Sequence, residues 1–104
     1  MQKERESLPD YLTSTVEMVD AAFPGGPTAD DYWPLLVLLG EGLCHENLAH
    51  VVSHVFKKDF WLVANDLLGA LGLEKDGIVR SPLYAGVQQR LVACGYAEWL
   101  EACD

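Results

Sequence analysis

The stretch Tyr32-Trp33-Pro34-Leu35-Leu36-Val37-Leu38-Leu39 is the most hydrophobic run of the chain, and it decides the fold. Its aliphatic residues are mostly leucine rather than β-branched, and Pro34 lacks the amide hydrogen that a central strand must donate. The run therefore predicts a helix and not a buried strand. Because apolar residues occupy every side of this helix, other elements must cover most of its circumference. We expect it to form the centre of the fold.

The residues before this run allow two starting points for the helix. Thr28 and Asp31 have the spacing of a capping box, so the helix can begin at Thr28. In that case Pro34 removes one backbone hydrogen bond and bends the helix. If the helix begins near Asp31, Pro34 lies in its first turn, where proline is tolerated. Both starts stay open, and Gly40 and Gly42 mark the end of the helix.

Four other segments repeat apolar residues at spacings of three and four, which is typical of amphipathic helices. They are 8–23, 44–56, 60–71 and 82–94. Ser7, Asp59 and Ser81 stand in the N-cap position before three of them, and Gly95 has the position of a C-terminal glycine after the last. The residues that we expect in the core are Leu8, Tyr11, Leu12, Val16, Val19 and Phe23; Leu48, Val51, Val52, Val55 and Phe56; Phe60, Val63, Ala64, Leu67, Leu68 and Leu71; and Tyr84, Val87, Leu91 and Val92.

Two segments lie outside these helices. We interpret 73–80 as a loop, because Asp76-Gly77 is a turn signal and Ile78-Val79 has no partner strand and reads as an extended linker. Residues 96–103 add a last turn or two that fold Trp99 and Leu100 back onto the bundle. The sequence thus predicts an all-α, single-domain bundle of about five helices in which the hydrophobic second helix is central.

Length and composition support one soluble domain over residues 1–104, with 1–6 frayed. A chain of 104 residues, half of them hydrophobic, can build one core without disulfides or a structural metal. No apolar run reaches the roughly 18 residues of a membrane span, and the mixed charges at 1–6 do not resemble a secretory signal. We expect a cytoplasmic protein that contacts no membrane.

The three cysteines, Cys44, Cys94 and Cys103, are an odd number without a C-x-x-C pair. With no sign of secretion, we expect all three to be reduced thiols. Such cysteines usually act as small buried hydrophobic residues rather than as ligands or nucleophiles. We therefore assign none of them to a site.

The charge of the chain is strongly and unevenly acidic. Seven Lys and Arg residues stand against 16 Asp and Glu residues, for a formal net charge of −9, and no Lys or Arg occurs between Glu6 and Phe56. Nucleic-acid binding depends on basic residues that displace counterions from phosphates, so this balance excludes a nucleic-acid partner. Solubility explains the acidity most simply, and a surface for a protein partner is the alternative.

One histidine-containing segment invites comparison with metal sites. His45 and His50 are five residues apart and point roughly 140° away from each other on a helix, so they do not match the zinc-protease motif. Glu46, His50 and His54 do share one helical row and form a possible three-ligand stripe. The same row also reads as the polar flank of an amphipathic helix, which we favour.

Two residues of the 60–71 segment stand apart from its apolar stripe. We interpret Asp66 as a solvated carboxylate. Trp61 lies off the stripe, and we expect it to pack in the core or at its rim; the alternative is an exposed contact surface with Leu62. No nucleophile elbow, P-loop, dinucleotide-binding glycine motif or paired-carboxylate motif is present, so we assign no catalytic, cofactor or metal residue.

The order of these signals resembles a small family of helical bundles, known mainly from mycobacteria and rhodococci, whose function is unknown. The residues that carry the resemblance are Phe23-Pro24-Gly25-Gly26-Pro27, Asp31 to Leu39, Ser81-Pro82, Val87, Arg90-Leu91 and Gly95-Tyr96, and they span about residues 20 to 100. Residues 40–76 depart from the acid- and arginine-rich helix of that family. The resemblance implies a bundle of about five helices in an actinobacterial cytoplasm, and it implies no catalytic residues.

An apolar core with an acidic surface and no reactive grouping favours a non-enzymatic interaction or structural module. We expect a monomer that needs no cofactor and contacts an unidentified protein partner. Two other functions stay open. One is a small metal-binding protein that uses His50 and His54, and the other is an acidic nucleic-acid mimic that binds a basic protein.

Overall fold

Seven α-helices and the 3-10 helix η3 form the chain between residues 12 and 102, the part that the computed structural model describes. In chain order they are α1 (Thr13–Ala22), η3 (Ala29–Asp31), α2 (Tyr32–Gly40), α3 (His45–Phe56), α4 (Phe60–Ala70), α5 (Lys75–Arg80), α6 (Pro82–Ala93) and α7 (Tyr96–Ala102). No strand occurs in this range. The radius of gyration of 12.9 Å matches the value of about 13 Å for one compact body of this length. The predicted all-α class is confirmed.

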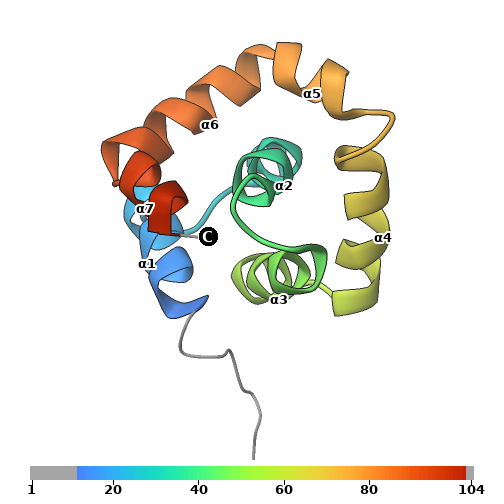
Figure 1. Cartoon of the computed structure of the whole chain (residues 1–104), viewed down its shortest axis with the longest axis horizontal. Coiled ribbons are helices and arrows are strands. Elements are labelled where there is room, and N and C mark those ends of the chain that lie inside the picture. The colour runs from blue at the N-terminus through green and yellow to red at the C-terminus, as the bar shows by residue number, and fades with distance from the viewer. Residues whose placement is uncertain (1–11, 103–104) are drawn as a thin grey trace, which may run out of the picture.

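Helix α2 is the centre of the molecule, as the sequence predicted. Figure 1 shows it enclosed by the other helices, and it contacts α3, α4, α5 and α6. The side chains from Pro34 to Leu39 are all buried. Since α2 begins at Tyr32, Pro34 lies in its first turn, and the second of the two predicted starts is the one observed. The Thr28–Asp31 capping box belongs to η3, where the Thr28 amide donates to Asp31 Oδ2 over 2.8 Å.

The predicted helix ends are confirmed where the structure describes them. The Asp59 carboxylate accepts from the amides of Trp61 and Leu62 at the start of α4, and Ser81 Oγ accepts from the Leu83 amide at the start of α6. Gly95 ends α6 with a φ of +96°, a conformation that favours glycine. The predicted cap at Ser7 and the core positions Leu8 and Tyr11 lie outside the described residues.

The prediction of about five helices was wrong at the C-terminal side. Residues 75–80, predicted as a loop with an extended linker, form α5, and the last turns form the separate helix α7. Asp76 and Arg80 are four residues apart and their side chains approach to 3.2 Å, a pairing that stabilises a helix despite Gly77. Ile78 packs against the core from α5.

Two predicted core residues are exposed instead. Leu68 of α4 and Val92 of α6 project from faces that no element between residues 12 and 102 covers. In α1 the buried face includes Thr15, Met18 and Ala22, which the sequence pattern did not assign to the core. Helices α4 and α6 are therefore buried on narrower stripes than their apolar residues suggest, whereas α1 is buried on a wider one.

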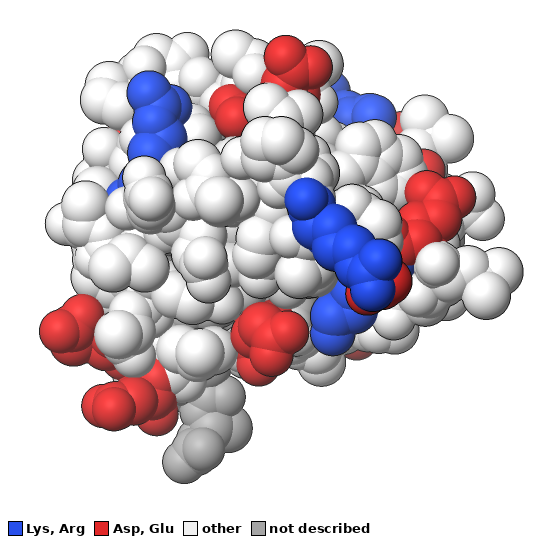
Figure 2. All heavy atoms as spheres, turned by 90° about the horizontal axis from the view of Figure 1, so that it is seen from above, with Lys and Arg blue, Asp and Glu red and all other residues white. Residues whose placement is uncertain are grey.

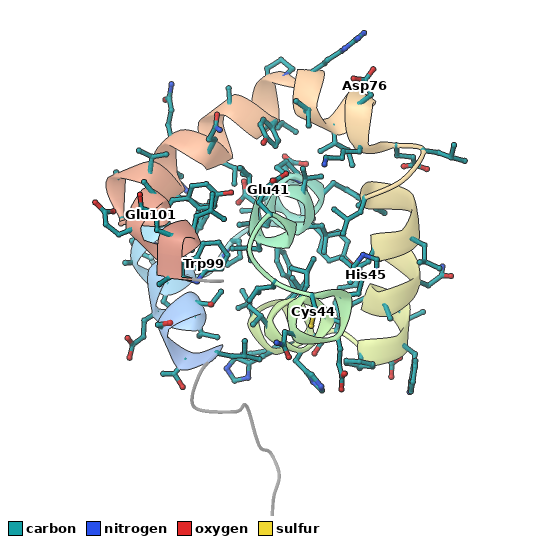
Figure 3. The ribbon with its side chains drawn as sticks, viewed as in Figure 1. Glu41, Cys44, His45, Asp76, Trp99 and Glu101 are labelled. Carbon is teal, nitrogen blue, oxygen red and sulfur yellow. The ribbon has the colours of Figure 1, made fainter. Side chains whose placement is uncertain are left out.

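Helix α7 closes the bundle against α1 and α2. Trp99 is buried and points inward from α7 (Figure 3), as predicted. The Tyr96 hydroxyl donates to the carbonyl of Leu38 over 2.7 Å in the interior. This carbonyl lies in the last turn of α2 and also accepts from the Glu41 amide over 3.4 Å, so Tyr96 adds a second hydrogen bond that stabilises the end of the central helix.

None of the helices in residues 12–102 combines the length and the apolar character that crossing a membrane requires.

Candidate interaction site

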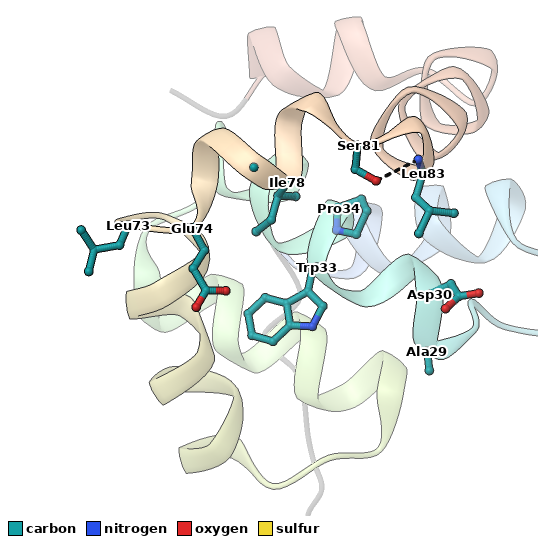
Figure 4. A pocket seen from close by; sticks show the side chains of 10 residues that line it. Ala29, Asp30, Trp33, Pro34, Leu73, Glu74, Ile78, Ser81 and Leu83 are labelled. Atoms are coloured by element: carbon teal, nitrogen blue, oxygen red, sulfur yellow. Dashed lines mark hydrogen bonds between the residues drawn. The ribbon is translucent and has the colours of Figure 1, made fainter.

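A groove of about 680 Å³ lies between the start of α2 and helix α5. Its wall comes from η3 and α2 on one side and from the α4–α5 loop, α5 and the start of α6 on the other (Figure 4). The lining residues are Ala29, Asp30, Trp33, Pro34, Leu73, Glu74, Gly77, Ile78, Ser81 and Leu83. A volume in this range suits a bound ligand or several side chains of a partner.

Trp33 is the central residue of this groove. In Figure 4 its indole ring lies between Ile78 and Glu74 on one side and Ala29 and Asp30 on the other. It is the only exposed residue of α2, at 37 % exposure, because the rest of that helix is surrounded by the bundle. Its ring meets the ring of Tyr32 edge to face with 5.3 Å between centroids, which holds the indole in place.

Two leucines form the rim of the groove. Leu73 follows α4, points away from Trp33 in Figure 4 and is 99 % exposed. Leu83 borders the groove from the first turn of α6 and is half exposed, in a turn that the Ser81 cap holds in place. An apolar floor with exposed leucines at its edge is typical of a surface that a partner covers.

The groove is acidic. Asp30 and Glu74 are its charged lining residues, and no Lys, Arg or His is among the lining residues. The basic side chains of the nearby helix α5 form ion pairs with other acidic residues. Arg80 pairs with Asp76, and Lys75 Nζ lies 3.6 Å from Glu41 Oε2. The electrostatic field in the groove therefore favours apolar ligands that also carry positive charge.

Trp33 also lines a smaller hollow of about 250 Å³, together with Tyr32, Lys58 and Asp66. The Tyr32 hydroxyl donates to Asp66 Oδ2 over 2.6 Å, and the Lys58 ammonium lies 4.2 Å above the centre of the Tyr32 ring. Asp66 is thus a partly buried hydrogen-bond acceptor, and its prediction as a solvated carboxylate was wrong. This contact joins α2 to α4.

Burial, together with the contact to Asp66, raises the pKa of Tyr32. Burial, the hydrogen bond to Asp66 and the negative charge of that carboxylate all raise the pKa of Tyr32, in that order of importance. The hydroxyl therefore stays protonated at neutral pH and acts as a structural donor rather than as a base or nucleophile. The cluster stabilises the wall of the groove.

The histidine row does not assemble into a metal site in the described structure. Glu46 and His50 approach to 3.9 Å between Oε2 and Nε2, and the His50 ring packs against Phe60 with 4.7 Å between centroids. His54 is exposed one turn further along α3. Among residues 12–102 no group of three or more His, Cys, Asp or Glu side chains is placed to hold a metal ion.

Nucleic-acid mimicry would need acidic residues aligned on one face, and the central helix supplies none. Helix α2 itself carries no acidic residue, since Asp30 and Asp31 precede it and Glu41 follows it. On the face shown in Figure 2, acidic and basic side chains are interspersed among uncharged ones. On that face there is neither a continuous acidic row nor a continuous basic stripe.

The cysteines and Trp61 also differ from the sequence-based predictions. Cys44, expected to be buried, is exposed in the turn before α3 (Figure 3), and Cys94 is half-buried; both thiols are free, and Cys103 lies outside the described residues. Trp61 is 75 % exposed, so the predicted packing in the core or at its rim was wrong and the alternative of an exposed surface is observed.

Sequence reasoning missed the groove itself. Its two walls come from segments that are at least 39 residues apart in the sequence, from Pro34 to Leu73, and its α5 side was predicted as a loop. The chain matches no protein-family model, no curated protein and no solved structure. The resemblance to the helical-bundle family therefore stays a prediction.

Proposed function

We propose that this protein is a non-enzymatic interaction module that binds a segment of a partner protein in the groove at Trp33. The segment has apolar side chains that cover Trp33, Leu73 and Leu83, together with lysine or arginine beside Asp30 and Glu74. The observation that supports this proposal best is the exposed indole of Trp33 on a helix that is otherwise buried. Partly exposed tryptophans in apolar hollows are frequent centres of binding energy.

The charge pattern favours a protein segment over a small apolar molecule. The chain as a whole carries a net charge of −9, and the two charged lining residues are both acidic. A neutral apolar molecule gains nothing from these carboxylates, whereas a basic amphipathic segment gains affinity and a faster association rate. No enzymatic activity is part of this proposal.

Selection from a library of random peptides of about 12 residues tests the proposal. We expect the enriched peptides to combine aromatic or aliphatic residues with Lys or Arg, and their binding to weaken between roughly 50 mM and 500 mM salt. Acidic or uncharged enriched peptides, or no enrichment, would contradict it.

A matched pair of variants locates the binding site. Leu83→Asp places a charge on the rim, and Val92→Asp places the same charge on the same helix at an equally exposed position outside the groove; the two residues are 49 % and 54 % exposed. We expect Leu83→Asp to weaken peptide binding at least about tenfold and Val92→Asp to change it less than about twofold. Equal effects of the two substitutions would place binding elsewhere.

A further inference from the structure

Three aromatic rings border the smaller hollow beside the groove. Tyr32 and Trp33 come from the start of α2, and Phe56 comes from the end of α3. The planes of Trp33 and Phe56 stand at 85° and 84° to the plane of Tyr32, with 5.3 Å and 5.1 Å between the ring centroids. The three rings therefore do not stack flat on one another, and together they border one small space.

A cation already lies at these rings. The ammonium of Lys58, in the turn between α3 and α4, is 4.2 Å from the centre of the Tyr32 ring. Aromatic faces attract cations because the electron density above and below the ring plane is negative. Lys58 forms no ion pair with the acidic side chains that the structure describes, so its ammonium can leave the ring without breaking one.

A carboxylate adds negative charge to the same space. Asp66 of α4 lines the hollow, and its Oδ2 accepts from the Tyr32 hydroxyl over 2.6 Å. This hydrogen bond holds the carboxylate and the ring in fixed positions relative to each other. The carboxylate and the ring faces both attract positive charge, so the hollow favours a cationic group.

We propose that this hollow binds a methylated ammonium group, as trimethyllysine and choline carry it, and that Lys58 takes the place of that group in the free protein. The volume of about 250 Å³ is below the roughly 300 to 1,000 Å³ of pockets for drug-sized ligands, so it suits a single group of this kind.

Methylation distinguishes this group from an ordinary lysine. A trimethylated ammonium has no N–H that needs an acceptor, and it loses water more readily than the strongly hydrated ammonium of lysine. An external lysine offers only the head group that Lys58 already supplies from within the chain. A methylated ammonium can therefore displace Lys58 where a plain one cannot.

The inference goes beyond the proposed function, because the hollow selects a chemical group whether or not a segment lies in the groove. Trp33 lines both hollows, whereas Phe56 and Lys58 line only the smaller of the two. Substitutions of Phe56 and Lys58 therefore test the hollow and leave the lining of the groove unchanged. A negative result with them does not count against peptide binding in the groove.

NMR titration with choline at roughly 150 mM salt tests the need for positive charge. The control ligand is the neutral alcohol in which carbon replaces the choline nitrogen. We expect choline to bind with a dissociation constant on the order of 1 to 10 mM and the neutral alcohol to bind at least about tenfold more weakly. No binding of choline, or equal binding of the two ligands, overturns the inference.

Two variants place choline at the rings. Phe56→Leu keeps an apolar side chain and removes the ring, and we expect it to weaken choline binding about threefold or more. Lys58→Ala removes the internal cation, and we expect it to tighten choline binding about threefold or more. Lys57→Ala is the matched control, because this exposed neighbour carries the same charge and does not line the hollow. Equal tightening by Lys57→Ala and Lys58→Ala, or weakening by Lys58→Ala, contradicts the role of Lys58.

Peptides distinguish the two sources of the group. Random peptides of about ten residues with a central trimethyllysine are selected for binding, and each is compared with its plain-lysine version and with free trimethyllysine. A methylated peptide that binds at least about tenfold more tightly than both supports a protein as the source. Free trimethyllysine that binds as tightly as every peptide supports a small molecule. Equal affinities of the methylated and plain versions contradict the selection for methylation.

Discussion

The indole N–H of Trp99 donates to the Thr15 hydroxyl over 2.7 Å in the interior, which ties the last helix to the first. The two residues are 84 positions apart, and both are buried. A buried donor without an acceptor costs about 1 to 3 kcal/mol. Removing the Thr15 hydroxyl alone would therefore destabilise the fold, because the Trp99 N–H would stay buried without an acceptor.

Thr15→Val keeps the shape of the side chain and removes the acceptor. We expect it to lower the free energy of unfolding by about 1 to 3 kcal/mol, whereas Thr15→Ser retains the hydroxyl and lowers it less. Urea titration measures both variants. If Thr15→Val is as stable as the wild type, the Trp99 hydrogen bond does not hold α7 in place.

Truncation of the central helix tests its position in the core. Leu36 is fully buried, and Leu36→Ala is expected to lower the free energy of unfolding by about 2 to 5 kcal/mol. Leu73→Ala, at a 99 % exposed position, is the control and is expected to change it by less than about 0.5 kcal/mol. A loss below about 1 kcal/mol for Leu36→Ala in denaturant titration would place Leu36 at the periphery.

Substitutions of two glycines by alanine are expected to change the stability of the protein in opposite directions. Gly86 lies inside α6 with no atom within 4 Å of the Cβ position, so Gly86→Ala is expected to stabilise the protein by about 0.5 to 1 kcal/mol. Gly95 has a φ of +96°, and Gly95→Ala is expected to destabilise by about 1 to 3 kcal/mol. Thermal melting of the two variants checks the signs, and stabilisation by Gly95→Ala would contradict the observed helix end.

Alkaline pH tests the contact between Tyr32 and Asp66. The pKa of Tyr32 is raised in the folded state above its ordinary value near 10, so the folded chain holds this proton more tightly than the unfolded chain. Its contribution is fully present below pH 10 or so and is lost as the pH rises further. We expect stability to fall above about pH 10, and Tyr32→Phe to lessen that fall.

Tyr32→Phe is also expected to lower the free energy of unfolding at neutral pH. Tyr32→Phe leaves the partly buried Asp66 without this donor, and we expect a loss of about 1 to 3 kcal/mol at pH 7. Chemical denaturation at pH 7 and at about pH 11 measures both effects. An unchanged pH dependence in Tyr32→Phe would show that other groups govern the alkaline transition.

The features that the sequence predicted well are local ones. The run from Tyr32 to Leu39 predicts a buried helix because its residues are apolar on every side of the helix. This prediction needs no knowledge of the neighbouring elements. Asp59 and Ser81 predict helix starts because an N-cap side chain accepts hydrogen bonds from backbone amides two or three residues later. Each of these signals is complete within about eight consecutive residues.

The candidate site was not predictable in the same way. The contact between Tyr32 and Asp66 joins residues 34 positions apart, and neither residue carries a local sign of it. Helix α5 was missed because Asp76-Gly77 reads as a turn, although the spacing of Asp76 and Arg80 was a usable helix signal. Without α5, Trp33 has no opposite wall and appears only as the flank of a core helix.

The most direct test of the proposed function compares the two exposed tryptophans. The affinity of the selected peptides is measured by calorimetry for the wild type, Trp33→Ala and Trp61→Ala, which remove the same side chain from the groove and from α4. We expect Trp33→Ala to weaken binding by about 30-fold or more, equivalent to about 2 kcal/mol, and Trp61→Ala to leave it within about twofold. Binding that survives Trp33→Ala, or that is lost in Trp61→Ala instead, would contradict the assignment of the groove as the contact site.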